Sequence, residues 1–363
     1  MHGVSLMTGD NVRVPVEVTL PYSPLSMGRA LRSIKTRIFP PEPKPLILMY
    51  HRIADVLLDP WGIAVSPSHF REHLDVLRNT RTPLTLTDFV RGLRSGTLSP
   101  DAVAITFDDG YVDNLVEGKP RLSAADVPAT VFLPTGYLDW AGEFWWDELA
   151  RLILVGAGPR NLELAIQGKV MCFDLGENIT PPGEGWRAWL NPARTPRQQA
   201  LLAIWGVLRK LGDTERETLM AGIRRELTTS PMEAGSGRPM TSEEVRALVS
   251  DGLIAIGSHT VSHPLLTALD VLACRREMAV SKHACEVLAG AEVRTFAYPF
   301  GDFDAEVRAA VVDEGFICAC STRYNPVFST SDFLALPRIQ VFDSSGEVFE
   351  RSLRDASLAP AGA

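Results

Sequence analysis

Two acidic residues and two histidines follow apolar runs where strands are expected to end. Asp108 and Asp109 directly follow the run Ala102–Phe107, and His259 and His263 are four residues apart. Neighbouring carboxylates resist joint ionisation, although Asp-Asp-Gly is also an ordinary turn sequence. Imidazole binds zinc, nickel, cobalt or iron, and three protein ligands with open positions for water are typical of hydrolytic metal sites. We therefore predict Asp109, His259 and His263 as metal ligands and Asp108 as the general base.

A second histidine pair serves as an internal control. His69 and His73 have the same spacing, but they lie within a predicted helix at 66–77 among charged neighbours. No strand ends before them. We expect both side chains to face solvent and to bind no metal.

A third pattern lies at 294–301, where an apolar strand leaves through Pro299 and Gly301. Such a turn exposes backbone N–H groups that can donate to a developing oxyanion. An ordinary strand-terminating turn is the alternative interpretation.

The elements that position these residues alternate regularly. Short apolar runs alternate with helical patterns, which predicts βα units around a parallel sheet. The polar residues stand at the carboxyl ends of the strands, where such folds carry their chemistry. The predicted strands are 46–50, 102–107, 129–133, 253–256, 294–298 and 316–320, and the later helices are 269–288 and 304–314.

The alternation breaks between residues 137 and 239, which we interpret as a mainly helical insertion. It contains a predicted hairpin at 162–175 that turns at Gly168, followed by helical patterns at 196–211 and 214–227. Trp145 and Trp146 are expected to pack inside the insertion, with a sugar-stacking surface as the alternative.

The predicted domain order follows from this break. Residues 45–136 and 240–343 form one α/β unit around the insertion, residues 1–44 form an arm with a Pro-rich linker, and residues 344–363 form a tail. The segment 27–38 is predicted to form a short basic helix, which is either a solvated part of the arm or a contact with a membrane surface or a partner.

Bulk properties exclude several classes of protein. A content of 45% hydrophobic and 22% charged residues is that of an ordinary folded chain, and a net charge of −8 argues against a nucleic-acid partner. No segment approaches the roughly 20 apolar residues of a membrane span, and the first residues lack the apolar core of a signal peptide. The odd number of cysteines, 5, fits no disulfide framework. We expect a reducing compartment, the cytoplasm.

Together these motifs resemble the polysaccharide deacetylases of the NodB-homology class (carbohydrate esterase family 4), over about residues 45–134 and 240–341. The resemblance implies a distorted, incomplete (β/α) barrel and hydrolysis of an N-acetyl group on an amino sugar, with release of acetate. It implies a divalent metal, zinc before nickel, cobalt or iron. It also implies the backbone N–H of Phe300 in the oxyanion hole, and Thr260 bracing the histidine loop.

Two departures from the family pattern matter. The usual third-motif Arg is replaced by Ala297, and the late Leu-x-His motif is absent. The sequence 49–53 resembles the opening strand of the biofilm poly-N-acetylglucosamine deacetylases, which implies His51 as general acid. A satisfied histidine at a strand end is the alternative. Arg338 is the candidate to replace the missing Arg.

Two other functions stay open at this point. An inactive carbohydrate-binding or scaffold protein on the same fold would explain the altered motifs. A deformylase, or another hydrolase of small C–N amides, would keep the chemistry and change the substrate.

Overall fold

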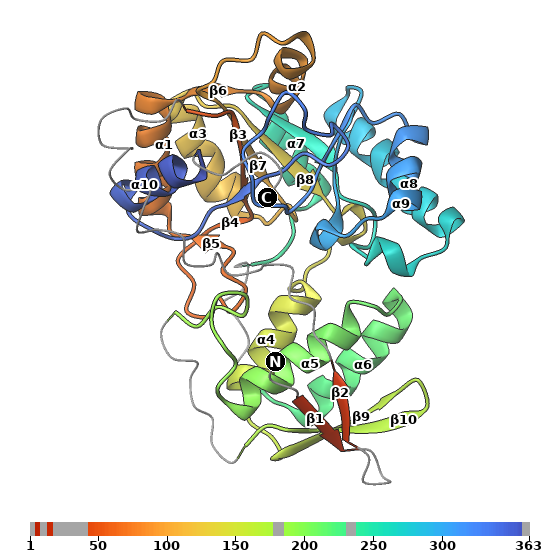
Figure 1. Cartoon of the computed structure of the whole chain (residues 1–363). Coiled ribbons are helices and arrows are strands. Elements are labelled where there is room, and N and C mark those ends of the chain that lie inside the picture. Colours follow the sequence, from red (N-terminus) through yellow and green to blue (C-terminus); the bar gives the residue numbers. More distant parts are fainter. Residues whose placement is uncertain (1–3, 8–12, 17–42, 177–184, 230–236, 358–363) are drawn as a thin grey trace. The chain divides into compact units, whose positions relative to one another are not determined.

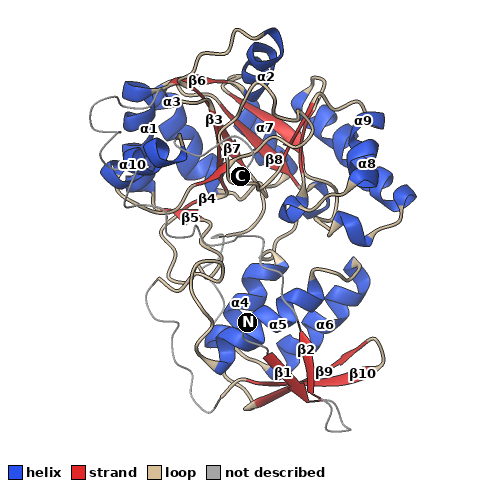
Figure 2. Cartoon of the chain, viewed as in Figure 1, coloured by secondary structure: helices blue, strands red, loops and turns tan. Residues whose placement is uncertain are grey.

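The computed structural model describes residues 4–7, 13–16, 43–176, 185–229 and 237–357 (Figures 1 and 2). The chain divides into two compact units. The sheet unit comprises residues 24–56, 63–141 and 237–363, and the insertion unit comprises residues 1–23, 57–62 and 142–236.

The sheet unit is built on a parallel sheet in the order β13-β12-β11-β8-β7-β3-β14, with β6 also paired to β7. Its longer strands are continuous apolar runs buried on both faces, as parallel strands covered by helices should be. The strands are β3 (Leu46–Tyr50), β6 (Thr82–Leu84), β7 (Ala102–Phe107), β8 (Ala129–Leu133), β11 (Ile254–Ser258), β12 (Thr295–Ala297), β13 (Cys318–Cys320) and β14 (Ile339–Gln340).

The two ends of this sheet approach each other through one short segment. Leu336 forms a parallel bridge with Cys320, and Ile339 pairs with Leu48 of β3. The sheet is therefore curled, which confirms the predicted distorted, incomplete (β/α) barrel.

Helices lie on both sides of the curled sheet, with α1, α3 and α10 on one side and α8 and α9 on the other (Figure 1). Their starts are set by capping side chains: Ser66, Thr241 and Asp270 each accept a hydrogen bond from the third residue of the helix that follows. The helices are α1 (Pro67–Thr80), α2 (Leu86–Ser95), α3 (Lys119–Ala125), α7 (Ser242–Val249), α8 (Val271–Ala289), α9 (Ala305–Asp313) and α10 (Gly346–Ala356), with a π-helical turn η2 (Asn114–Gly118) before α3.

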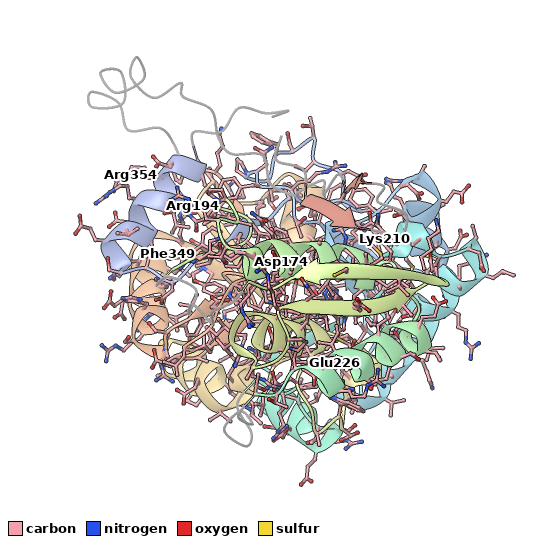
Figure 3. The ribbon with its side chains drawn as sticks, turned by 90° about the horizontal axis from the view of Figure 1, so that it is seen from below. Asp174, Arg194, Lys210, Glu226, Phe349 and Arg354 are labelled. Atoms are coloured by element: carbon pink, nitrogen blue, oxygen red, sulfur yellow. The ribbon has the colours of Figure 1, made fainter. Side chains whose placement is uncertain are left out.

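The segment expected as a C-terminal tail contains α10. Its Phe349 side chain is buried, whereas Arg354 points away from the helix toward solvent (Figure 3). Because α10 also covers His73, the expectation that His73 faces solvent is wrong. Its ring is fully buried and stacks on Phe349 at a centroid distance of 4.0 Å, while His69 bonds Asp343.

The insertion unit follows the predicted hairpin and helices closely. Two N-terminal strands, from the segment expected as an arm, extend the hairpin into a sheet of order β2-β1-β10-β9. The predicted helix at 27–38 lies outside the described residues. The elements are β1 (Val4–Met7), β2 (Arg13–Val16), α4 (Trp145–Val155), β9 (Asn161–Ile166), β10 (Lys169–Asp174), α5 (Pro196–Leu208) and α6 (Asp213–Glu226).

A short stretch from early in the chain completes the insertion unit. The pair β4 (Arg52–Ile53) and β5 (Ala64–Val65) belongs to the sheet unit, but the loop between them carries Trp61 into the insertion unit. There the Trp61 ring packs on Trp189 and Trp205, each at 5.7 Å between centroids. Among the described helices, none combines the length and apolarity needed to cross a bilayer.

Candidate functional site

Three predicted ligands meet at the carboxyl ends of two strands. Asp109 follows β7, and His259 and His263 follow β11. Asp109 Oδ1 lies 3.6 Å from His259 Nε2 and 3.4 Å from His263 Nε2. One ligand atom from each residue falls within 4.8 Å of the others, and all three residues are buried. Among the described residues, no other group of three such side chains forms a comparable cluster.

The His259 ring is oriented by a backbone carbonyl. Its Nδ1 lies 2.7 Å from Ala297 O, which can only accept a hydrogen bond. The Nδ1 atom therefore carries the proton, and the Nε2 lone pair faces Asp109. Burial lowers the pKa of His259, although Asp108 opposes this shift. A neutral imidazole held in this way through its other nitrogen is the usual state of a metal ligand.

The loop that carries His263 is fixed from two sides. Its backbone N–H donates to Thr260 Oγ1 at 3.1 Å, as expected for a bracing residue. Glu277 of α8 accepts hydrogen bonds from the backbone N–H groups of Val261 and Ser262, at 2.8 and 2.9 Å. Thr260 and His263 both have positive φ, at 69° and 53°. Strained backbone of this kind persists only where the surroundings hold it.

Asp108 lies beside the three ligands and is paired with Arg338. Arg338 Nη1 and Nη2 donate to the two carboxylate oxygens, each at 2.7 Å, and the Arg338 side chain is fully buried. Burial would raise the pKa of Asp108, but the Arg338 guanidinium outweighs it and holds that pKa below its usual range. The carboxylate is therefore ionised and oriented by Arg338. That Arg338 replaces the absent third-motif Arg stays a prediction.

His51 follows β3 and lies within electrostatic reach of Asp108, Arg338 and His259. Burial lowers its pKa to about 4, and Asp108 opposes the shift. The ring is therefore less basic than an ordinary imidazole, whose pKa is 6.5. Its Nδ1 is buried and has no hydrogen-bond partner in the part of the chain that the structure describes.

Phe300 lies next to the ligands through its ring. The ring contacts His263 edge to face, at 4.6 Å between centroids, and the residue has φ of 57°. Its backbone N–H as an oxyanion donor stays a prediction.

The three ligand side chains fit a divalent metal ion. They offer two imidazole nitrogens and one carboxylate oxygen, the donor set of catalytic zinc sites with an open coordination position. Burying an ionised carboxylate costs free energy unless a cation compensates its charge. A bound metal ion would provide that compensation for Asp109.

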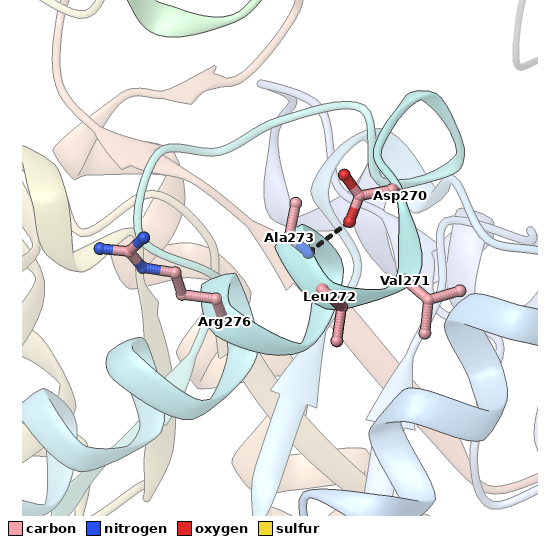
Figure 4. A pocket seen from close by; sticks show the side chains of 5 residues that line it. All are labelled: Asp270, Val271, Leu272, Ala273 and Arg276. Carbon is pink, nitrogen blue, oxygen red and sulfur yellow. Dashed lines mark hydrogen bonds between the residues drawn. The ribbon is translucent and has the colours of Figure 1, made fainter.

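Other candidates lie elsewhere. Trp145 and Trp146 are only 6% and 5% exposed, so the packing interpretation holds and the sugar-stacking alternative is wrong. A hollow of about 580 Å³ at the start of α8 is lined by none of the predicted site residues (Figure 4). His73 bonds Tyr50 and Ser344 instead of joining the three ligands.

Sequence reasoning missed the residues that support this site. Glu277 stands in the middle of a long helix, where a glutamate gives no special signal. Asp113 and Asn114 lie a few residues after the paired carboxylates, and that proximity could have singled them out.

Comparison with known proteins shows what this chain is similar to. Residues 226–318 match a family model described as polysaccharide deacetylase. No curated protein sequence matches the chain. The structure is similar to the Streptococcus pyogenes deacetylase PplD in complex with acetate, at TM-score 0.54 and 17% identity, over 86% of this chain and 99% of that one.

Two further solved structures have the same fold. IcaB from Ammonifex degensii matches at TM-score 0.54 and 15% identity, over 87% of this chain and 98% of that one. A de-N-acetylase from Aggregatibacter actinomycetemcomitans matches at TM-score 0.53 and 15% identity, over 85% and 99% of the two chains. The resemblance of this chain to the polysaccharide deacetylases is thus confirmed by the family model and by the fold.

Proposed function

We propose that this protein hydrolyses the N-acetyl group of an amino sugar in a glycan or glycoconjugate, leaving a free amine and releasing acetate. The observation that carries the proposal is the buried cluster of Asp109, His259 and His263 beside the Arg338-bound carboxylate of Asp108. The acetate in the PplD structure agrees with this product.

Asp109, His259 and His263 would hold a divalent metal, zinc foremost. A bound ion of this kind polarises an amide carbonyl and lowers the pKa of a water molecule toward 7.

The remaining residues take defined parts in the reaction. Asp108 accepts the proton of the attacking water, and Arg338 keeps that carboxylate ionised and aimed. The Phe300 N–H donates to the amide carbonyl oxygen as it becomes an oxyanion. His51 donates a proton to the departing amine nitrogen. Because the pKa of His51 is lowered, its protonated form is a strong donor present as a small fraction at neutral pH.

An inactive scaffold is the less favoured alternative. A scaffold has no need of a buried carboxylate that requires its own buried guanidinium. The Arg338 to Asp108 pair supplies the very contact that the altered third motif lacks.

The test is acetate release from N-acetylglucosamine oligomers by the zinc-loaded protein. Asp108→Asn should keep its zinc and lose roughly 10²- to 10⁴-fold in turnover, because proton transfer is removed. Asp109→Asn should also bind zinc more weakly. Equal zinc loss in both variants would contradict the division of roles, and no acetate release by the loaded wild type would contradict the function.

A further inference from the structure

The loop that follows the paired carboxylates also holds the strand end that carries His51. Asn114 Nδ2 donates to the backbone carbonyl of His51 at 2.8 Å. Asp113 Oδ1 accepts from the backbone N–H of Ile53 at 3.0 Å, and Asp113 Oδ2 accepts from Arg52 Nε at 3.0 Å. One loop therefore holds three consecutive residues beginning at His51.

The orientation of the Asn114 amide follows from its partners. Nδ2 also lies 3.2 Å from Asp113 Oδ1, so both of its neighbours are acceptors. A flipped amide would place its oxygen against two oxygens. Asn114 is 1% exposed, and its Oδ1 has no hydrogen-bond partner among the described residues. A buried amide kept with one unsatisfied oxygen is costly, which indicates that its donor is needed.

The His51 ring depends on this backbone support. Its Nδ1 makes no hydrogen bond within the described chain. The place of the ring is therefore set largely by its main chain and its packing. The backbone N–H of Asp108 in turn donates to Tyr50 O at 3.0 Å, which ties the base to the same strand end.

We propose that Asn114, assisted by Asp113, is a positioning residue that holds the His51 imidazole in register with Asp108. The proposal rests on the proposed function, in which the two groups act as acid and base. A displacement of about 1 Å in such a pair costs on the order of 100-fold in rate. Asp108, Asp113 and Asn114 lie on one short segment, which runs from the end of β7 to the first residue of η2. The acid is therefore aligned to the same piece of backbone that carries the base.

The first test is a double-mutant cycle on the zinc-loaded protein. Asn114→Ala should lower kcat about 10- to 100-fold, with KM and zinc content unchanged. In a His51→Ala background the same substitution should have no further effect, because its action passes through the imidazole. Asn114→Asp, equal in size but with an acceptor in place of the donor, should behave like Asn114→Ala. It replaces that variant if the truncation prevents folding.

The control is Gln198→Ala in the insertion unit. Gln198 is a buried amide that holds the backbone N–H groups of Arg194 and Thr195, at 2.8 and 3.1 Å. Its loss should lower the unfolding midpoint without changing kcat. A fall in kcat for Gln198→Ala matching that of Asn114→Ala would reduce the Asn114 effect to stability and overturn the proposal.

The second test needs no turnover. The ring resonances of His51 in the metal-free protein, followed by NMR, should shift in Asn114→Ala while those of His73 stay in place. Unshifted His51 signals, or additive losses in the cycle, would overturn the positioning role. If His51→Ala keeps full activity while Asn114→Ala still shifts the ring signals, the acid assignment in the proposed function fails and the holding contact stands.

Discussion

At the scale of single residues, the two adjacent buried carboxylates differ in the side chains that surround them. Asp109 shares its surroundings with two imidazoles, whereas Asp108 has a guanidinium on both oxygens. Two neighbouring carboxylates that would repel each other are thereby assigned to different partners. In the proposed function, the same sequence pair would supply one metal ligand and one ionised acceptor.

The Arg338 contact leads to a test of stability as well as rate. Arg338→Met leaves a buried carboxylate without its counter-charge, and breaking such a pair costs roughly 3–5 kcal/mol in the free energy of unfolding. Turnover should fall by roughly 10²-fold or more, because the base is neither oriented nor held ionised. Urea unfolding and acetate release measure the two effects. The control is Arg338→Met combined with Asp108→Asn, which should be more stable than Arg338→Met alone. Equal stability of the two would contradict the pairing.

His73 gives a prediction about pH. Burial lowers its pKa to about 4 from the ordinary 6.5. Between those values the unfolded chain takes up a proton that the folded chain does not, so folding becomes less favourable as pH falls from 6.5 to 4. Once the pH is below both pKa values, the free energy of unfolding is lower by roughly 3 kcal/mol. His73→Phe keeps a ring to stack on Phe349 but cannot titrate.

The measurement is urea unfolding of wild type and His73→Phe from pH 7.5 to 4.5. The stability difference between the two should move in favour of the variant as pH falls. His69→Gln is the control, since His69 is half-exposed and bonds Asp343 at the surface. A difference that stays constant over this range would mean that His73 does not resist protonation.

At the scale of elements, the sequence predicted what local pattern encodes. The strands Leu46–Tyr50 and Ala102–Phe107 coincide with their predicted bounds, because each is a continuous apolar run between polar residues. Strand β14 has only two residues, too few to show a hydrophobic pattern, so the sequence did not predict it. Its neighbour Arg338 meets Asp108 across 230 residues of chain, and only closure of the sheet brings them together.

The candidate site divides in the same way. The sequence predicts His259 and His263 as ligands because their spacing lies within one loop. It does not predict the role of Glu277, because that role arises only where α8 packs against this loop. The sequence analysis expects a tail at 344–363, whereas α10 is an amphipathic helix in which Phe349 and Leu353, four residues apart, lie on the buried face.

Glu277 gives the prediction at this scale. Glu277→Ala removes the acceptor for two backbone N–H groups of the histidine loop, so His263 should lose its fixed position. Such supporting contacts are worth about 10- to 100-fold in metal affinity. Zinc affinity by chelator competition is the measurement. Glu286→Ala is the matched control, because Glu286 lies on the same helix and accepts from Val293 N–H instead. Equal losses in the two variants would attribute the effect to α8 as a whole.

At the scale of the molecule, the chain crosses between two units more than once. The insertion leaves the sheet unit after residue 141 and returns at 237, and a loop with Trp61 at its tip also enters the insertion unit. The two flanks of the insertion are joined inside the sheet unit. Asp139 Oδ1 accepts from Ser242 N–H at 2.9 Å, and Asp139 N–H lies 3.4 Å from Met240 O. A short linker can therefore replace residues 142–236.

Because these flanks are held together, a variant that lacks the insertion can be designed. The variant would join residue 141 to 237 through a few glycines and serines, and replace residues 57–62 with a short turn, because Trp61 would otherwise lose its packing partners. Arg52 pairs with Ala64, so the ends of that loop are already close. The sheet unit has its own apolar core on both faces of the sheet, and it should fold by itself.

In this deletion variant, we expect metal binding to be kept and substrate preference to change. All three ligands, Asp108 and Arg338 lie in the sheet unit, so zinc affinity should stay within a few-fold of the full chain. Acetate release from long and short N-acetylglucosamine oligomers should change in ratio, if the insertion takes part in substrate choice as loops inserted at a catalytic rim do. Chelator competition and acetate assays on both proteins give the two quantities. An unchanged ratio would make the insertion a structural or assembly element. A deleted variant that folds but no longer binds zinc would show that the metal site needs support from the insertion, contrary to this division of the molecule.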